Sequence, residues 1–339
     1  MDELLSVIDL KKTFPIGRRR IVALDGGSLT VNRQEVVGLV GESGSGKSTM
    51  ARCIVRLTEP DSGQASFDGT DILHADSSTL RSIRRRMQLI YQDPYSSLNP
   101  RLRIGDAIGE AARFHRLVRG RAEEAALVSD LLDAVGLSGG DARKFPREMS
   151  GGQRQRVAIA RSLAVQPELL IADEAVSALD VSVQAQILNL FATLSIERHL
   201  AMVFISHQLA VIAQIAQRVA VMYLGRIVEI GDTIDVFTRP RHPYTRLLLD
   251  AHPSLDAPTH RRTPVLAGEL PSQDDIPSGC RFRSRCPLAE AICAEVDPPP
   301  VQVGPGHTTW CHVLGRDEGA GRLRAVVPPD AVAGTDELR

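Results

Sequence analysis

A nine-residue stretch at 41–49, GESGSGKST, restricts the possible fold of this chain more than any other feature. It fits the pattern G-x-x-x-x-G-K-[ST] and lies between an apolar run, VVGLV at 36–40, and a helix-forming stretch, KSTMARCIVRL. Glycines let such a loop curl so that its N–H groups converge on phosphate oxygens, and the start of the next helix adds positive potential. In this pattern Lys47 reaches the β- and γ-phosphates and the Ser48 hydroxyl binds Mg²⁺. The succession of strand, loop and helix therefore predicts an α/β fold with a phosphate-binding site.

Two further short runs, LLIA at 169–172 and MVFIS at 202–206, are apolar like VVGLV. Runs of this kind are typical of parallel strands that are buried on both faces. Helical patterns lie between them, such as RAEEAALVSDLLDAVG at 121–136, where Gly136 is placed to end the helix. We therefore expect an open α/β sheet whose ligands bind beyond the carboxyl ends of the strands.

Polar residues follow LLIA and MVFIS at that expected ligand edge. Asp173 and Glu174 come directly after LLIA, and neighbouring residues at a strand end project to opposite sides. Asp173 is the candidate Mg²⁺ partner, whereas Glu174 is the candidate base that orients and deprotonates the attacking water. His207 ends the third run and is a candidate contact to the γ-phosphate. The alternatives are ordinary surface charge for the carboxylates and a structural role for the histidine.

Composition limits the classes of partner. Lys and Arg total 40 against 41 Asp and Glu, so no excess of positive charge calls for a nucleic acid or an anionic membrane. The basic run RSIRRR at 81–86 is interpreted as a solvated helix face, with a binding patch as the alternative. The N-terminus lacks the charged-then-apolar order of a signal peptide, and no run approaches the ~18 apolar residues that span a bilayer. At 339 residues, we expect a soluble cytoplasmic chain with a full α/β core and a smaller appended unit.

A second glycine turn, in MSGGQRQR at 149–156, opens another helix-forming stretch and offers an anion backbone donors and a helix dipole. Together with GESGSGKST, YQDPYSSLNP, LLIADEAVSALD and ISHQ, it resembles the motif set of the ATP-binding cassette (ABC) family. In that family this signature turn binds the γ-phosphate of a nucleotide held by the opposite subunit, so two cassettes close head to tail over two ATP molecules. The resemblance implies that this chain needs a second ABC ATPase subunit, either another copy of itself or a homologous sibling.

The resemblance covers about residues 4–312 and implies roles for further residues. Phe14 would stack on adenine, Gln92 would meet Mg²⁺ and the reacting water, and Asp180 would link the two sites. Met149 stands where leucine is usual and Ala175 where proline is usual, and neither departure removes a catalytic group. The implied nucleotide-binding residues are Gly41, Ser43, Gly44, Gly46, Lys47, Ser48 and Thr49 in the first loop, and Ser150, Gly151, Gly152 and Gln153 in the donated turn, with Mg²⁺ held through Ser48, Gln92 and Asp173.

A finer resemblance concerns the stretch RHPYTRLLL at 241–249, which looks like the ATPase subunits of oligopeptide, dipeptide and nickel importers. It implies a peripheral ATPase on the cytoplasmic face of the membrane, beneath two permease subunits and supplied by an extracytoplasmic solute-binding protein. Import of peptides is the predicted function. The alternatives are import of nickel or another small solute, and a soluble cassette ATPase that acts on nucleic acid or ribosomes. The neutral charge and the HPY segment oppose the last alternative, so no nucleic-acid partner is expected.

Proline marks a change in the chain, because twelve of the 20 prolines lie between 240 and 305. That density opposes long helices and central strands. We therefore expect an ABC ATPase domain, a P-loop NTPase cassette, over 1–235, with a helical subdomain at about 96–165. It is followed by a small irregular domain, rich in Cys and Pro, over 236–312 and a disordered tail over 313–339.

The proline-rich segment holds Cys280, Cys286, Cys293 and Cys311. In a cytosolic chain such clustering indicates metal binding more than disulfides. Four thiolates could hold Zn²⁺ or an iron–sulfur cluster, or remain free thiols, and the spacing matches neither the common zinc sites nor the compact ferredoxin run. The resemblance to the importer ATPases, some of which carry a four-iron cluster, implies a [4Fe-4S] cluster here.

Overall fold

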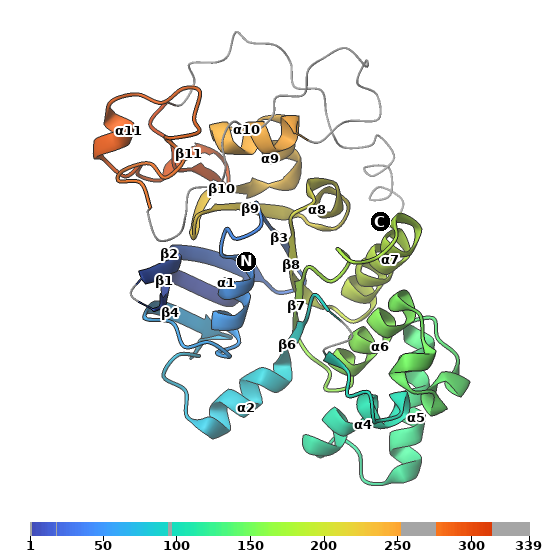
Figure 1. The fold of residues 1–339 in the computed structure, drawn as a ribbon. Coiled ribbons are helices and arrows are strands. Elements are labelled where there is room, and N and C mark those ends of the chain that lie inside the picture. The colour runs from blue at the N-terminus through green and yellow to red at the C-terminus, as the bar shows by residue number, and fades with distance from the viewer. Residues whose placement is uncertain (1, 18, 94–96, 252–275, 314–339) are drawn as a thin grey trace.

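The computed structural model describes residues 2–17, 19–93, 97–251 and 276–313 (Figure 1). The stretch 252–275 and all but Val313 of the predicted tail therefore lie outside the described residues. Within the described residues, no helix is both long and apolar enough to cross a membrane.

The three predicted strands lie side by side and parallel within the larger sheet. They are β3 (Val36–Val40), β8 (Ala201–Ser206) and β7 (Leu169–Asp173), in that order. Two more parallel strands flank them, β9 (Arg218–Tyr223) next to β3 and β6 (Met87–Ile90) next to β7. The predicted α/β class is confirmed, and every residue of β3, β7 and β8 is buried.

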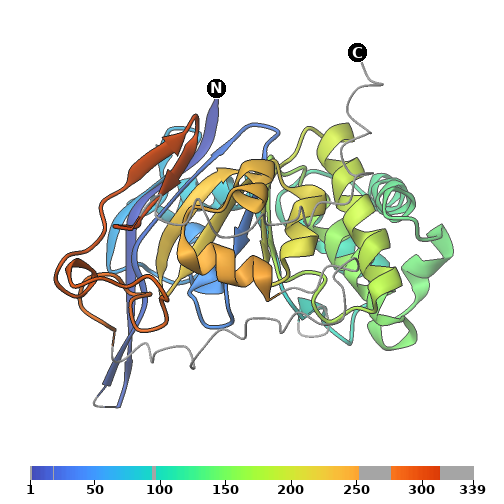
Figure 2. The same cartoon turned by 90° about the horizontal axis from the view of Figure 1, so that it is seen from above.

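Side chains along β3 point alternately to the two faces of the larger sheet and so contribute to two separate core layers. Val37 and Leu39 pack in the layer that contains an antiparallel sheet and the helix α1 (Lys47–Ile54), whereas Val36 and Val40 pack in the layer formed with the other helices. Figure 2 shows the larger sheet between these two layers. The antiparallel sheet has the order β2-β1-β4-β5, with β1 at Glu3–Ile16, β2 at Arg19–Asn32, β4 at Ser62–Phe67 and β5 at Thr70–Asp71.

The predicted helical subdomain packs on the second layer, beside α7 (Val181–Glu197) and α8 (Leu209–Ile215). Apolar residues from its helices, among them Ile108, Leu131 and Val157, are buried in one core with the sheet. Its elements are α4 (Ile104–Phe114), α5 (Arg121–Ala134), α6 (Gly151–Leu163) and two short 3₁₀ helices, η1 (Gly139–Arg143) and η2 (Pro146–Glu148).

The basic run at 81–86 forms the end of α2 (Ser77–Arg86) and is more than a solvated face. Arg86 pairs with Glu168 at 2.5 Å and also with Asp68, while Arg84 donates to the Val55 carbonyl at 3.0 Å. These contacts attach α2 to the rest of the fold. The interpretation of the run as only solvated charge is therefore corrected.

The proline-rich segment extends the larger sheet instead of forming a wholly irregular unit. Strand β12 (His307–Thr309) pairs antiparallel with β10 (Arg226–Asp232), and β11 (Val301–Gly304) pairs with β12. The full order is β11-β12-β10-β9-β3-β8-β7-β6. The residues after β10 also form the short helices α9 (Thr233–Thr238), α10 (Pro243–Asp250) and α11 (Ile292–Glu295).

A buried carboxylate holds this segment on the sheet. Glu229 of β10 is fully buried and accepts from the backbone N–H groups of Arg241 and His242, at 2.7 and 2.9 Å. His307 Nε2 of β12 lies 2.7 Å from the same carboxylate. Burial lowers the pKa of His242 to about 4, so this imidazole is neutral near pH 7 and its Nδ1 accepts from the Tyr244 N–H.

Candidate functional site

The loop between β3 and α1 needs glycine at two of its positions. Gly41 and Gly46 have φ of +156° and +108°, in the region that L side chains rarely adopt. A Cβ at Gly41 would lie 2.2 Å from the Met222 carbonyl oxygen, and one at Gly46 would lie 2.4 Å from that of Ala23. The loop thus curls against two backbone segments, with Ser43 and Gly44 exposed and Thr49 half-buried in α1.

Lys47 and Ser48 begin α1 and connect the loop with β7. The Lys47 side chain is buried, which lowers its pKa, and its Nζ donates to the carbonyls of Gly41 and Glu42 at 2.8 and 2.9 Å. Ser48 Oγ donates to Asp173 Oδ1 at 2.8 Å. Burial raises the pKa of Asp173. The hydroxyl and the carboxylate predicted to bind Mg²⁺ are therefore in direct contact.

Glu174 is the meeting point of three segments. Its Oε2 accepts from Gln92 Nε2 at 2.8 Å, and its Oε1 lies 3.4 Å from His207 Nδ1. Its φ of +49° is uncommon for a residue with a side chain, and its N–H donates to the Ile205 carbonyl at 3.0 Å. The structure thus brings together the candidate base, the glutamine and the histidine at the carboxyl ends of β7 and β8.

The second glycine turn forms the start of α6 and is stabilised within itself. Ser150 Oγ accepts from the Gln153 N–H at 3.3 Å while Gln153 Oε1 accepts from the Ser150 N–H at 3.0 Å, which is a capping box. A Cβ at Gly152 would lie 2.5 Å from Val183 Cγ1, so α6 and α7 approach closely there.

The turn and the phosphate loop belong to different layers of the fold. Helix α6 packs in the layer of the helical subdomain, whereas α1 packs with the antiparallel sheet, and Figure 1 shows them on opposite sides of β7. The Ser150 side chain bonds to Gln153 within the second turn, whereas Lys47 Nζ bonds to the carbonyls of Gly41 and Glu42 within the phosphate loop. The two turns of one chain therefore lie in separate layers.

Phe14 and Asp180 remain predictions. Phe14 lies half-buried on β1, where Lys12 Nζ is 5.4 Å from its ring centroid, and no described contact joins it to the phosphate loop. Asp180 is exposed at the start of α7 and its carbonyl accepts from the Gln184 N–H.

A groove beside Gln92 was missed by sequence reasoning. It measures about 420 Å³ and lies between β6 and α4, with Tyr91, Leu89, Leu57 and Phe114 among its lining residues. Phe114 and Leu57 are 65% and 52% exposed. Large exposed apolar side chains at such a groove are typical of a protein contact. Their exposure depends on tertiary packing, so no pattern in the sequence could have revealed it.

The four cysteines of the C-terminal segment gather without forming a ligand set. The Cys280 N–H donates to the Cys293 carbonyl at 2.8 Å, and all four thiols are free. Burial raises the pKa of Cys280 and Cys311 to about 11, with a smaller contribution from the neighbouring thiols. Across the described ranges, no three Cys, His, Asp or Glu side chains are arranged to hold a metal ion. The side-chain positions therefore give no support to an iron–sulfur or zinc site.

Comparison with known proteins identifies both parts of the chain. Residues 24–177 match the family model described as ABC transporter, and residues 228–293 match that of the oligopeptide/dipeptide transporter C-terminal region. The chain is 50% identical to a probable peptide ABC transporter ATP-binding protein, y4tS, of Sinorhizobium fredii, over 98% of this chain and 94% of the relative. It is 44% identical to the oligopeptide transport ATP-binding protein AppF of Bacillus subtilis, over 92% and 98% of the two chains.

The fold has a solved counterpart. The dimeric post-hydrolysis structure of the ATP-binding cassette MJ0796, bound to ADP and Pi, aligns with a TM-score of 0.63 and 29% identity. The alignment covers 68% of this chain and 99% of the cassette. The predicted cassette fold is therefore confirmed.

Proposed function

Because this chain belongs to the ATP-binding cassette family and is an ATPase subunit of a membrane transporter, we propose that it drives the import of di- or oligopeptides. The observation that carries the ATPase chemistry is the meeting of Gln92, Glu174 and His207 at the strand ends that follow the phosphate loop. The class of solute is supported by the C-terminal match and by the names of the relatives.

The residues at the loop fit a Mg²⁺-bound nucleotide. The hydroxyl of Ser48, the carboxylate of Asp173 and the amide oxygen of Gln92 are the hard oxygen donors that Mg²⁺ prefers. When bound, Mg²⁺ neutralises charge on the β- and γ-phosphate oxygens. Lys47 supplies a further positive charge in a buried setting, where its electrostatic effect is strengthened.

Glu174 acts as the general base in this proposal. Gln92 Nε2 and the His207 ring hold its two carboxylate oxygens, so the base is oriented before a water arrives. His207 is 40% exposed, which leaves its other ring nitrogen available to the γ-phosphate. Glu174 would take a proton from the water that attacks phosphorus, while ADP leaves with the electron pair of the broken bond.

The turn at 150–153 serves the nucleotide of a second cassette in this proposal. The capping box presents the start of α6 in a fixed orientation, with backbone N–H groups and the positive end of the helix dipole available to an anion. Residues 150–153 lie in a different layer from this chain's own loop, which supports donation to an opposite subunit. That subunit is a second copy or a sibling chain.

The groove beside Gln92 provides a place for the permease, at the cytoplasmic face of the membrane. We assign it to a cytoplasmic segment of a permease subunit, because Tyr91 lines the groove and the next residue, Gln92, contacts the base. Movement of the segment at 91–92 would transmit nucleotide state between the catalytic carboxylate and the membrane partner. An extracytoplasmic binding protein would deliver the solute.

Reconstitution with candidate permeases tests the function. In vesicles, the ATPase rate should rise when peptide-loaded binding protein is added.

Phe114 lines the groove assigned to the permease. Its replacement by glutamate should therefore abolish assembly with the permeases without weakening ATP binding by the free subunit. Stimulation by nickel-loaded binding protein alone, or co-purification with RNA or DNA in place of permeases, would assign a different function.

We also keep a [4Fe-4S] cluster on Cys280, Cys286, Cys293 and Cys311 as a proposal that rests on the family resemblance. The expected result is a broad brown absorbance and about four irons per chain in protein purified without air, lost in the variant Cys293→Ser. Because the thiols as placed do not form a ligand set, binding requires their side chains to rearrange. Zinc, or no metal, in the anaerobic protein would end the proposal and leave the ATPase assignment unaffected.

A further inference from the structure

A stretch of the C-terminal segment, RFRSR at 281–285, reaches the phosphate loop through Arg285 and the turn beside the loop through Arg281. Arg281, Phe282 and Arg285 are 7%, 1% and 9% exposed. Arginine is rarely buried to this degree unless its guanidinium is paired. The partners of the two arginines therefore show what this stretch, called here the RFRSR segment, is placed to hold.

Arg285 pairs with Glu42, the second residue of the phosphate loop. Its Nη1 and Nη2 lie 2.7 and 2.9 Å from the two carboxylate oxygens, which is the bidentate geometry that fixes both position and orientation. The Glu42 N–H donates to the hydroxyl of Tyr244, a fully buried residue of α10, at 3.0 Å. The side chain and the backbone of Glu42 are thus both held by residues beyond 240.

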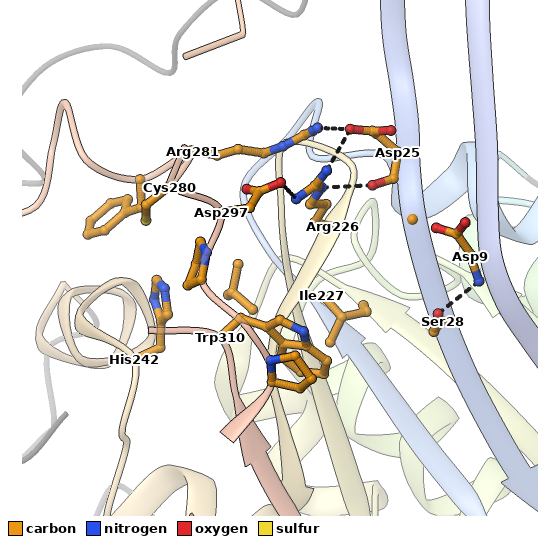
Figure 3. A pocket seen from close by; sticks show the side chains of 15 residues that line it. Asp9, Asp25, Ser28, Arg226, Ile227, His242, Cys280, Arg281, Asp297 and Trp310 are labelled. Carbon is orange, nitrogen blue, oxygen red and sulfur yellow. Dashed lines mark hydrogen bonds and ion pairs between the residues drawn. The ribbon is translucent and has the colours of Figure 1, made fainter. Parts of the chain in front are cut away.

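Arg281 makes a second connection, through the turn between β9 and β10. Its guanidinium donates to the Leu224 carbonyl and to the Asp25 carboxylate, as Figure 3 shows for the latter. The residue after Leu224, Gly225, donates its N–H to the Ser45 carbonyl of the phosphate loop at 2.7 Å. The RFRSR segment therefore supports the loop near both its second and its fifth residue.

Packing of aromatic rings around Phe282 couples the contacts of Arg281, Arg285 and Tyr244 to one another. The Phe282 ring lies between those of Tyr223, Tyr244 and His242, with centroid separations of 5.3, 5.4 and 5.8 Å. Because Tyr244 bonds to Glu42 and Phe282 lies between the two arginines, displacement of the segment would disturb every contact to the loop together.

The charge of Glu42 gives these contacts a consequence for binding. A carboxylate within a loop that cradles phosphates repels them, and the repulsion is strong in a partly buried site. Arg285 neutralises that carboxylate and draws it into a fixed ion pair. The carbonyl of the same residue accepts from Lys47 Nζ, so the ion pair also fixes the backbone that this phosphate-binding lysine contacts.

We propose that the RFRSR segment positions the phosphate loop for ATP, with Arg285 and Tyr244 as positioning residues, and that bound nucleotide in turn stabilises the docking of this segment. The second half follows from the first, because coupling between two sites is reciprocal. This inference rests on the ATP site proposed above. It makes the C-terminal segment a determinant of nucleotide affinity and not only an attachment.

Binding of MgATP by the isolated full-length subunit tests the inference. Arg285→Gln should weaken binding about tenfold, within the usual range of coupling between sites. The double variant Glu42→Gln with Arg285→Gln should recover most of the affinity, because it leaves no unpaired carboxylate. Arg283→Gln is the matched control, since that side chain bonds to Ser278 Oγ at 3.4 Å and not to the loop.

Tyr244→Phe, which removes only the hydroxyl, should weaken binding by a smaller factor and provides a milder variant if Arg285→Gln does not fold.

The reciprocal effect is measured by amide hydrogen exchange over residues 278–286. MgATP should slow exchange there in the parent protein, and Arg285→Gln should reduce this protection. Three results would overturn this inference while leaving the proposed ATP site intact. They are unchanged MgATP affinity in Arg285→Gln and Tyr244→Phe, no recovery of affinity in the double variant, and no protection of 278–286 in a parent protein that binds MgATP. A parent protein that does not bind MgATP would instead overturn the proposed ATP site.

Discussion

Replacement of Glu174 by glutamine is expected to lower ATP hydrolysis by the assembled transporter ~10²-fold or more, the usual contribution of a positioned base, while MgATP binding is retained. The glutamine side chain has the same shape and can still accept from Gln92 Nε2, which lies 2.8 Å from the native carboxylate. Only the ability to take a proton is lost. ATP should therefore hold the cassette dimer closed, which is measured by size-exclusion chromatography with MgATP.

The matched control is Glu197→Gln, because Glu197 is exposed at the last residue of α7, several turns of helix beyond the strand end that carries Glu174. Its hydrolysis rate should equal that of the parent. If Glu174→Gln instead hydrolysed ATP within a few-fold of the parent in the same complex, Glu174 would not be the general base. His207, whose Nδ1 lies 3.4 Å from the Glu174 carboxylate, would then be the next candidate.

The central part of the fold was predictable because its signals are local. The runs at 36–40, 169–172 and 202–206 are apolar throughout, and the structure buries them on both faces in adjacent parallel strands. The positions of Asp173, Glu174 and His207 followed from the rule that parallel strands bring their carboxyl ends to one edge. Their contacts with Ser48 and with one another agree with that reasoning.

The C-terminal segment was not predictable in the same way. Proline density opposes regular structure, but a strand as short as β12 needs few free N–H groups and finds an open partner in β10. The residues that attach the segment, such as Glu229 with His307 and Glu42 with Arg285, are 78 and 243 positions apart. No local pattern specifies contacts over such separations. The cysteines illustrate the same limit, because their clustering in the sequence indicated metal binding, whereas their placement among the described residues does not form a ligand set.

If a second subunit completes the nucleotide site, as we propose, several of the predicted residues need not find a partner within one chain. Residues 150–153 lie in another layer from the loop at 41–49, and Asp180 is exposed. A turn that is already capped and oriented, and that lies in another layer from this chain's own phosphate loop, is suited to a ligand that a second subunit carries.

Gly151→Asp should therefore abolish ATP-driven dimer closure and transport while leaving ATP binding by the isolated subunit within a few-fold of the parent. Gly151 is the first residue of α6, and a Cβ there would lie 3.8 Å from Leu179 Cδ2, an ordinary contact. An aspartate in the first turn of a helix also interacts favourably with the positive end of the helix macrodipole, so the fold should be retained. The added carboxylate would instead repel the γ-phosphate presented by the opposite subunit.

The matched control is Gly140→Asp, which adds the same charge at an exposed position of η1 in the same subdomain, where a Cβ would lie 3.5 Å from Ser138 Oγ. Dimer closure and transport by this variant should equal those of the parent. Closure is measured by cross-linking or chromatography in the Glu174→Gln background, where ATP persists, and affinity by titration of the isolated subunit. Loss of ATP binding by isolated Gly151→Asp, with its melting temperature unchanged, would place the turn at the chain's own nucleotide. Such a result would end the proposal of donation between subunits, because the charge would then act within a single cassette.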